Sequence, residues 1–231
     1  MKILIINPNS NPEMTRKIEE AARAFAAGEF EVVCLAAPGA PRFIETYEDQ
    51  ARAAPGMSKL LKDNTDAFDA FVVACHCDPN LDLMKEISRK PVVGIGEASM
   101  KMATMLGHRF SVVSTAAHSI PNKEALVEKY HLRGLLASVR APGARGMDES
   151  LEEKYFRTAK AAVDEDGAEV IVLGCAGLAG LDKRLQERLG VPVLDGVVCA
   201  LIIAFGLSRY GIATSKARRY NPEQTKKAPH E

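Results

Sequence analysis

Short apolar runs alternate along the chain with longer segments whose apolar residues recur every three or four positions. The short runs are rich in Val, Ile, Leu and Ala, as expected of parallel strands covered by helices on both faces. This alternation is typical of an α/β protein. It predicts eight strands, at 2–7, 31–36, 70–74, 91–95, 110–114, 135–140, 169–173 and 192–194.

The longer segments between these runs have the period of amphipathic helices. Several are followed directly by a glycine, a residue that suits the end of a helix because it tolerates the left-handed backbone conformation. The predicted helices with such an end are 12–27, 149–166 and 181–189, and a further apolar helix is predicted at 197–207.

The two halves of the chain repeat one arrangement. The third strand of each half ends in a cysteine, Cys75 or Cys175, and a Pro-Val strand follows at Pro91 or Pro192. We therefore predict two pseudo-symmetric Rossmann-like lobes, each a four-stranded parallel sheet flanked by helices. The predicted division is 1–97 for the first lobe, 98–216 for the second and 217–231 for a flexible tail, with the C-terminal helix at about 198–215 exchanged onto the first lobe.

This repeat predicts where a ligand binds. Open α/β sheets bind ligands beyond the carboxyl ends of their strands. Two lobes that face each other at those ends would place Cys75 and Cys175 on opposite walls of one cleft.

Composition narrows the class of protein. The 231 residues, 47% of them hydrophobic, suffice for one or two buried cores. Thirty basic residues balance thirty acidic ones, so no net field favours nucleic acid or an anionic membrane, and no apolar run is long enough to span a bilayer. We expect a cytoplasmic protein with a small-molecule partner, and we expect its five cysteines to be free thiols.

Two thiols on opposite faces of a substrate suit racemisation. That reaction needs a base on one face of a stereocentre and an acid on the other, and the pKa of a thiol can be brought near neutrality. Each cysteine follows a strand where a helix should begin, and the N–H groups of such a turn favour a thiolate. Either cysteine alone also fits an ordinary core residue, which is our interpretation of Cys34 and Cys199.

The run Cys75-His76-Cys77 also raises the question of a metal site. Adjacent side chains on an extended strand point to opposite faces, and no second Cys or His cluster completes a tetrahedral set. We therefore predict no metal.

In its two cysteines and in several other segments, the sequence resembles the aspartate/glutamate/hydantoin racemase superfamily, and most closely its hydantoin and allantoin racemase branch. The matching segments follow one another in order over almost the whole chain. They are Ile6-Asn-Pro-Asn-Ser10, Ala74-Cys75 with Asp78-Pro79, Pro91–Glu97, Phe110–Thr115, Val172–Gly177, Pro192–Gly196 and Gly211–Lys216.

The resemblance implies a cofactor-independent racemase in which Cys75 and Cys175 alternate as base and acid. It also implies a homo-oligomer, and a substrate-binding role for Asn9, Ser10, Ser114 and Thr115. Short neutral donors and acceptors of this kind would suit an uncharged imide ring. The stretch Asn7–Asn11 equally fits a turn that caps the following helix.

Other residues are candidates for the same site. The backbone of Ala176 and Gly177 leaves room for close approach of a ligand. Tyr47, in a loop expected between Pro41 and Pro55, is a further substrate-binding candidate, as are Glu97 and His118, although a solvated loop explains them as well.

His76 departs from the family pattern, in which an apolar or aromatic residue often follows the first cysteine. It could bind a polar substituent of the substrate, tune Cys75, or simply be a satisfied loop histidine. The substrate therefore stays open between allantoin, a 5-substituted hydantoin and another cyclic ureide.

Three other functions remain as alternatives. An amino-acid racemase of the aspartate or glutamate type would be expected to carry hydroxyl or amide groups after each cysteine, where this chain has His76 and Ala176. A decarboxylase or cis-trans isomerase would need one essential cysteine. A ligand-binding module without catalysis would have no need for two equivalent cysteines.

Overall fold

The protein comprises two units, each built on its own parallel sheet. The computed structural model describes residues 1–143 and 149–221, so the part of the predicted tail from 222 onward lies outside the described residues. Within the described residues, Met1–Ala74, Asp78–Gly94 and 201–221 form the first unit, and Cys75–Cys77 with the described part of Ile95–Ala200 form the second. Within the described ranges, no helix has the length and apolar character needed to cross a membrane.

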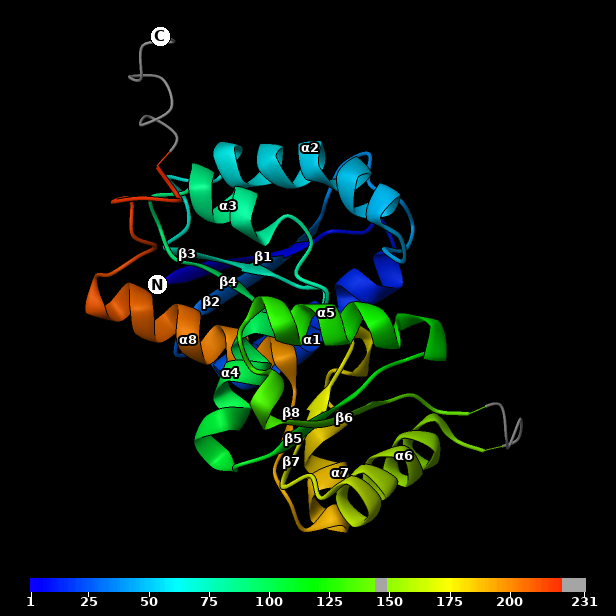
Figure 1. Cartoon of the computed structure of the whole chain (residues 1–231). Helices are drawn as coiled ribbons and strands as arrows, with labels where there is room; N and C mark the ends of the chain where they lie inside the picture. The colour runs from blue at the N-terminus through cyan, green and yellow to red at the C-terminus, as the bar shows by residue number, and fades with distance from the viewer. Residues whose placement is uncertain (144–148, 222–231) are drawn as a thin grey trace, which may run out of the picture. The chain divides into compact units, whose positions relative to one another are not determined.

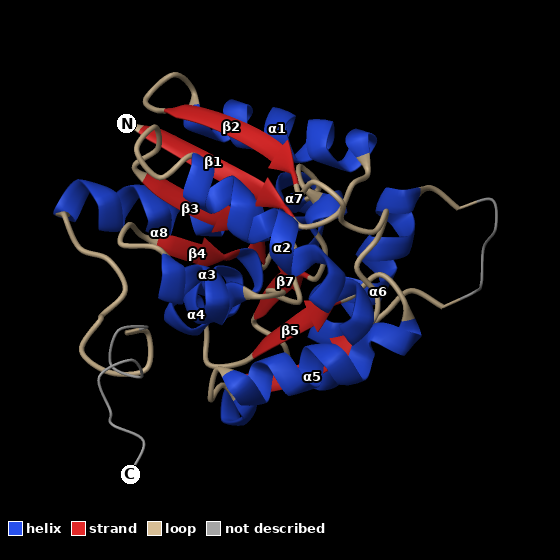
Figure 2. Cartoon of the chain, turned by 90° about the horizontal axis from the view of Figure 1, so that it is seen from above, coloured by secondary structure: helices blue, strands red, loops and turns tan. Residues whose placement is uncertain are grey.

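The first sheet contains four parallel strands in the order β2-β1-β3-β4, which lie side by side in Figure 2. They are β1 (Lys2–Asn7), β2 (Glu31–Ala36), β3 (Ala70–Val73) and β4 (Val92–Gly94). Every residue of β3 is buried, because helices cover both faces of the sheet.

The second sheet repeats this topology with the order β6-β5-β7-β8. Its strands are β5 (Phe110–Val113), β6 (Leu136–Arg140), β7 (Val170–Leu173) and β8 (Val193–Leu194). The predicted fold class, two four-stranded parallel sheets flanked by helices, is confirmed, and the predicted strand bounds are correct to within one residue at each end.

Helices cover both faces of the first sheet. α2 (Tyr47–Asp63) and α3 (Leu81–Ile87) pack on one face, where Met57 and Met84 join the core formed with Phe71. Figure 1 shows α1 (Pro12–Ala26) and the later part of α8 (Gly196–Tyr210) on the other side of this sheet. Phe205 of α8 stacks on Phe30, with ring centroids 5.0 Å apart.

The helix α2 differs from the predicted loop between Pro41 and Pro55. Thr46 begins it with a reciprocal capping box, in which its hydroxyl accepts the N–H of Asp49 and the Asp49 carboxylate accepts the N–H of Thr46. Pro55 lies inside the helix and removes one backbone hydrogen bond. Ala53 and Met57 of this helix are fully buried in the core that covers the sheet.

The second unit has the same layered arrangement. α4 (Ile95–Leu106) and α5 (Ile120–Lys129) pack on the face of Phe110 and Val172. α6 (Leu151–Asp166) and α7 (Asp182–Leu189) pack on the opposite face.

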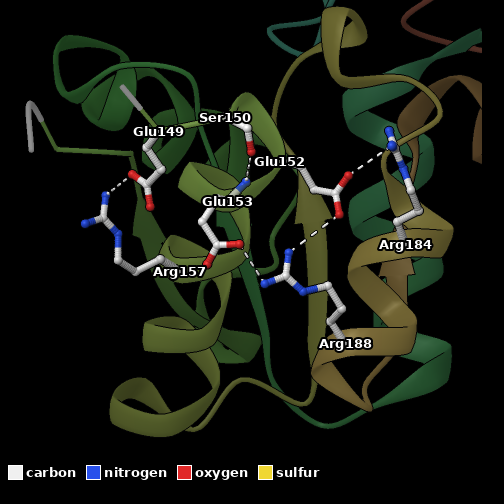
Figure 3. Close-up of polar contacts among 7 residues, drawn as sticks. All are labelled: Glu149, Ser150, Glu152, Glu153, Arg157, Arg184 and Arg188. Atoms are coloured by element: carbon white, nitrogen blue, oxygen red, sulfur yellow. Dashed lines mark hydrogen bonds and ion pairs between the residues drawn. The ribbon is translucent and has the colours of Figure 1, made fainter. Parts of the chain in front are cut away.

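Ion pairs tie α6 to α7. Arg188 pairs with Glu153 at 2.7 Å and with Glu152 at 3.5 Å, and Arg184 pairs with Glu152 at 2.9 Å (Figure 3). The Arg188 guanidinium also lies 3.6 Å from the ring centre of Phe156. These contacts join the two helices that pack on the same face of β7.

Candidate active site

Two cysteines occupy equivalent places in the doubled fold. β3 ends at Val73 and β7 at Leu173, and in each case the second residue after the strand is a cysteine, Cys75 or Cys175. Although β3 belongs to the first unit, Cys75–Cys77 belongs to the second, together with Cys175. Both thiols are therefore part of one unit.

The predicted helix N-terminus is wrong after Cys75, and after Cys175 it is limited to one 3-10 turn that Cys175 itself caps. After Cys75 the chain makes a turn and α3 begins only at Leu81, and after Cys175 it makes a single 3-10 turn, Ala176–Leu178, with α7 beginning at Asp182. The backbone contribution that favours a thiolate at Cys175 therefore comes from the N–H of Gly177.

The electrostatic surroundings of Cys175 hold opposing influences. Burial of its sulfur raises the pKa of this thiol, and the N–H of Gly177, which donates to Sγ at 3.3 Å, lowers it. A negative charge on Cys75 would raise the same pKa, and the Lys123 ammonium lowers it. Cys175 thus interacts electrostatically with the equivalent thiol of the repeat and with a cation.

Tyr155 of α6 belongs to the same surroundings. Burial raises the pKa of its phenol, and negative charge on Cys175 raises it further. The phenol therefore stays protonated next to the thiol at neutral pH.

Cys75 has a second sulfur beside it. Its Sγ lies 3.3 Å from Sγ of Cys77, close enough for one thiol to donate a hydrogen bond to the other. When Cys75 is a thiolate, the Cys77 thiol becomes the donor, which stabilises the charged form.

His76 is buried and has a hydrogen-bonding partner at each ring nitrogen. Nε2 lies 3.2 Å from Oγ of Ser99, and Nδ1 lies 3.4 Å from Nζ of Lys123. Burial lowers the pKa of His76 well below its usual value, and the Lys123 charge lowers it further. The ring is therefore neutral at physiological pH, and its role in binding substrate stays a prediction.

Sequence reasoning missed Lys123 and Ser99. Lys123 lies on α5 three and four positions before the buried Leu126 and Val127, which places it on the apolar face of that helix. A lysine at such a position is the signal that could have identified it.

The remaining predicted substrate-binding residues of the second unit follow β5 and β7. Ser114 is buried, and its hydroxyl lies 2.6 Å from that of Ser119, whereas Thr115 is exposed. Ala176 is buried, and Gly177 contributes the N–H that donates to Cys175.

The other predicted binding residues, Asn9, Ser10 and Tyr47, belong to the first unit. Asn9 is buried, and its side-chain oxygen accepts the N–H of Asn11 at 2.9 Å, while Asn11 caps α1. The turn-and-cap interpretation of this loop is thus confirmed. Ser10 is exposed, and Tyr47, at the first position of α2, is 74% exposed. Their contact with a substrate stays a prediction.

The secondary candidates and the other cysteines differ in their surroundings. Glu97 forms an ion pair with Lys101 at 2.7 Å, and His118 is exposed. Burial raises the pKa of Cys34 and of Cys199 to about 12, and both are buried core residues, as expected. Across the described residues, no group of three or more His, Cys, Asp or Glu side chains is arranged to hold a metal ion.

Comparison with known proteins decides the family. The sequence model of the Asp/Glu/Hydantoin racemase family matches residues 3–204. The chain belongs to this family. A hydantoin racemase from Pseudomonas sp. (strain NS671) is 38% identical to this racemase, over 97% of the present chain and 93% of its own.

Solved structures agree with this assignment. An allantoin racemase from Klebsiella pneumoniae has a TM-score of 0.88 and 35% identity, covering 95% of this chain and 92% of its own. An allantoin racemase from Pseudomonas fluorescens has a TM-score of 0.88 and 37% identity, covering 95% and 96%. The protein is thus an isomerase of the racemase type.

Proposed function

We propose that this racemase inverts the stereocentre of a cyclic ureide, a 5-substituted hydantoin or allantoin, by two-base proton transfer between Cys75 and Cys175. The observation that carries the proposal is the equivalent placement of the two thiols after β3 and β7, within electrostatic reach of each other in one unit. The relatives named hydantoin and allantoin racemase support this substrate class.

In the proposed reaction, one cysteine is a thiolate and the other a thiol. The thiolate removes the proton from the stereocentre, and the electron pair left on that carbon delocalises onto the neighbouring carbonyl oxygen. The thiol then delivers its proton to the opposite face of the same carbon. After one turnover the two cysteines have exchanged protonation states, and the reverse reaction starts from the other enantiomer.

Neutral groups suit the recognition of such a ring. We propose that Asn9, Ser10, Tyr47, Ser114 and Thr115 contact its amide and carbonyl groups, because short hydroxyl and amide side chains can donate and accept without adding charge. In the same proposal His76 and the backbone of Ala176 and Gly177 contribute to the binding site. The chemistry uses side chains alone and requires no cofactor.

The test follows single enantiomers of allantoin and of several 5-substituted hydantoins in deuterated water, with chiral chromatography and mass spectrometry of each enantiomer. Reactions without enzyme correct for spontaneous racemisation. We expect optical activity to decay while one deuterium enters at the stereocentre, at a rate unchanged by a chelator.

Two results would contradict the proposal. Racemisation without solvent deuterium in the product would exclude the two thiols as acid and base, because the second thiol delivers a proton that exchanges with solvent, and return of the abstracted proton by the first cysteine only regenerates the starting enantiomer. Failure of every cyclic ureide to react, with turnover of an open-chain amino acid, would assign the protein to a different branch of its family.

A further inference from the structure

Lys123 is a buried cation whose surroundings contain thiols and an imidazole. Only 7% of the residue is exposed. Among the described residues, its ammonium contacts Nδ1 of His76 and forms no ion pair with a carboxylate. A buried ammonium without a counter-charge is costly, so its presence here calls for an anion within reach of its field.

The hydrogen bonds around His76 have a defined direction. Ser99 Oγ donates to the carbonyl oxygen of Ile95 at 2.7 Å, so it accepts from Nε2–H of His76. Nδ1 of the neutral ring is then an acceptor, and it accepts a hydrogen bond from the Lys123 ammonium. The chain therefore runs from Lys123 through His76 to Ser99, and it holds Nζ in place without neutralising it.

The protonation states of the two cysteines require one negative charge. A two-base racemase is active when one thiol of the pair is ionised and the other is not. Lys123 contacts His76, the residue next to Cys75, and its charge acts on Cys175. The fixed Lys123 cation then balances the thiolate charge in both resting forms of the enzyme, whether Cys75 or Cys175 is the ionised cysteine.

We propose that Lys123 is a positioning residue that supplies the single counter-charge for the thiolate shared by Cys75 and Cys175. The inference deepens the proposed function and rests on it. It gives the buried lysine a role and explains why His76, held neutral, follows the first cysteine: a protonated imidazole would add a second cation to a site that needs one.

Among the described groups that act on the pKa of Cys175, Lys123 carries the full positive charge. Tyr155 on α6 is a neutral acid whose pKa burial raises, and the N–H of Gly177 contributes a partial charge only. His76 carries no charge at neutral pH because burial and Lys123 both lower its pKa.

The test replaces Lys123 by methionine, which keeps the length of the side chain and removes the charge. The matched control is Lys129→Met, because Lys129 lies on the same helix but is exposed. Lys123→Arg retains the charge and serves as the conservative variant. Thermal unfolding of each variant verifies that it is folded.

The readout is the rate of iodoacetamide alkylation of the free enzyme as a function of pH, resolved by peptide mass spectrometry at Cys75 and Cys175. An opposite charge close to a titrating group lowers its pKa by about 1–3 pH units, so we expect the midpoint of alkylation in K123M to rise by about one pH unit or more. At a pH below both midpoints, the alkylation rate should fall about tenfold for each pH unit by which the midpoint rises. K129M should titrate like the wild type, and K123R should retain most of the wild-type behaviour.

An unchanged midpoint in K123M would overturn the proposal, and so would a midpoint in K123R as high as that in K123M. If K123M changes only the KM of substrates that carry an acidic substituent, the lysine binds substrate and is not the counter-charge. Because alkylation needs no substrate, failure of the enzyme to racemise any ureide would leave this titration intact as a separate result.

Discussion

Replacing Gly174 by alanine tests whether the position of Cys175 depends on close contact between its loop and β5. A Cβ at residue 174 would lie 2.8 Å from the carbonyl oxygen of Val113 and 3.1 Å from Cα of Ser114. The same Val113 oxygen accepts the N–H of Gly174 at 2.8 Å. The new methyl group therefore meets backbone that is already held by the sheet.

The size of the effect follows from this geometry. Carbon–oxygen contacts settle at about 3.3–3.6 Å, so the loop and β5 must separate by roughly half an ångström. Overpacking of this kind costs about 1–3 kcal/mol, while the loss of glycine's freedom in the unfolded chain returns about 0.4–1 kcal/mol. We expect G174A to be less stable by about 1–2 kcal/mol, and to racemise roughly tenfold to a hundredfold more slowly because Cys175 is displaced.

Urea unfolding and racemisation rates measure the two effects. Gly206 of α8 provides the matched control, because a Cβ there meets nothing within 4 Å and alanine favours the helix, so G206A should gain up to about 1 kcal/mol and keep its rate. If G174A were as stable and as fast as the wild type, the close approach would not position the cysteine, and this reasoning would be refuted.

Three further predictions concern groups around the site and its supporting sheet. Because the pKa of His76 is lower in the folded than in the unfolded chain, the unfolded state binds more protons below about pH 6.5, and stability should fall by up to about 1.4 kcal/mol per pH unit there. Urea unfolding of H76Q should show a smaller fall, and equal falls in both proteins would contradict this assignment. Cys77→Ala removes a donor to the Cys75 thiolate and should therefore raise the pH midpoint of Cys75 alkylation by about 0.5–1 pH unit. A midpoint at or below the wild-type value would contradict this prediction. Arg140→Met breaks the bidentate ion pair with Asp166 (2.6 and 2.7 Å) that joins β6 to the end of α6. We expect the free energy of unfolding to fall by only about 1 kcal/mol, because the pair is partly exposed and solvent screens it. An unchanged urea midpoint would show that the pair does not stabilise the fold.

The fold was predictable because its signals are repetitive. Buried parallel strands consist of nearly continuous apolar residues, and the same order of strand, helix and cysteine occurs twice in one chain. The helix at 47–63 was not predictable in this way, because Pro55 interrupts the pattern that would otherwise mark it, and its capping box depends on Thr46 and Asp49 acting together.

The two cysteines of the site could be predicted from the sequence, whereas most of the residues that surround them could not. Cys75 and Cys175 are marked by their equivalent positions after strands. Their electrostatic environment depends on tertiary contacts: Lys123 is 48 residues beyond Cys75 in sequence, and His76 is buried although it lies in a loop. A turn prediction also could not show that Cys175 is followed by a single 3-10 turn, in which the N–H of Gly177 donates to its sulfur.

The central claim is that two thiols act on opposite faces of one stereocentre. The most direct measurement is hydrogen–deuterium exchange at that carbon, followed separately for each enantiomer, in Cys75→Ser and Cys175→Ser. The account predicts that both variants lose racemisation and that each still exchanges one enantiomer, the opposite one in the two proteins. Full racemisation by either variant, or exchange of the same enantiomer by both, would contradict it.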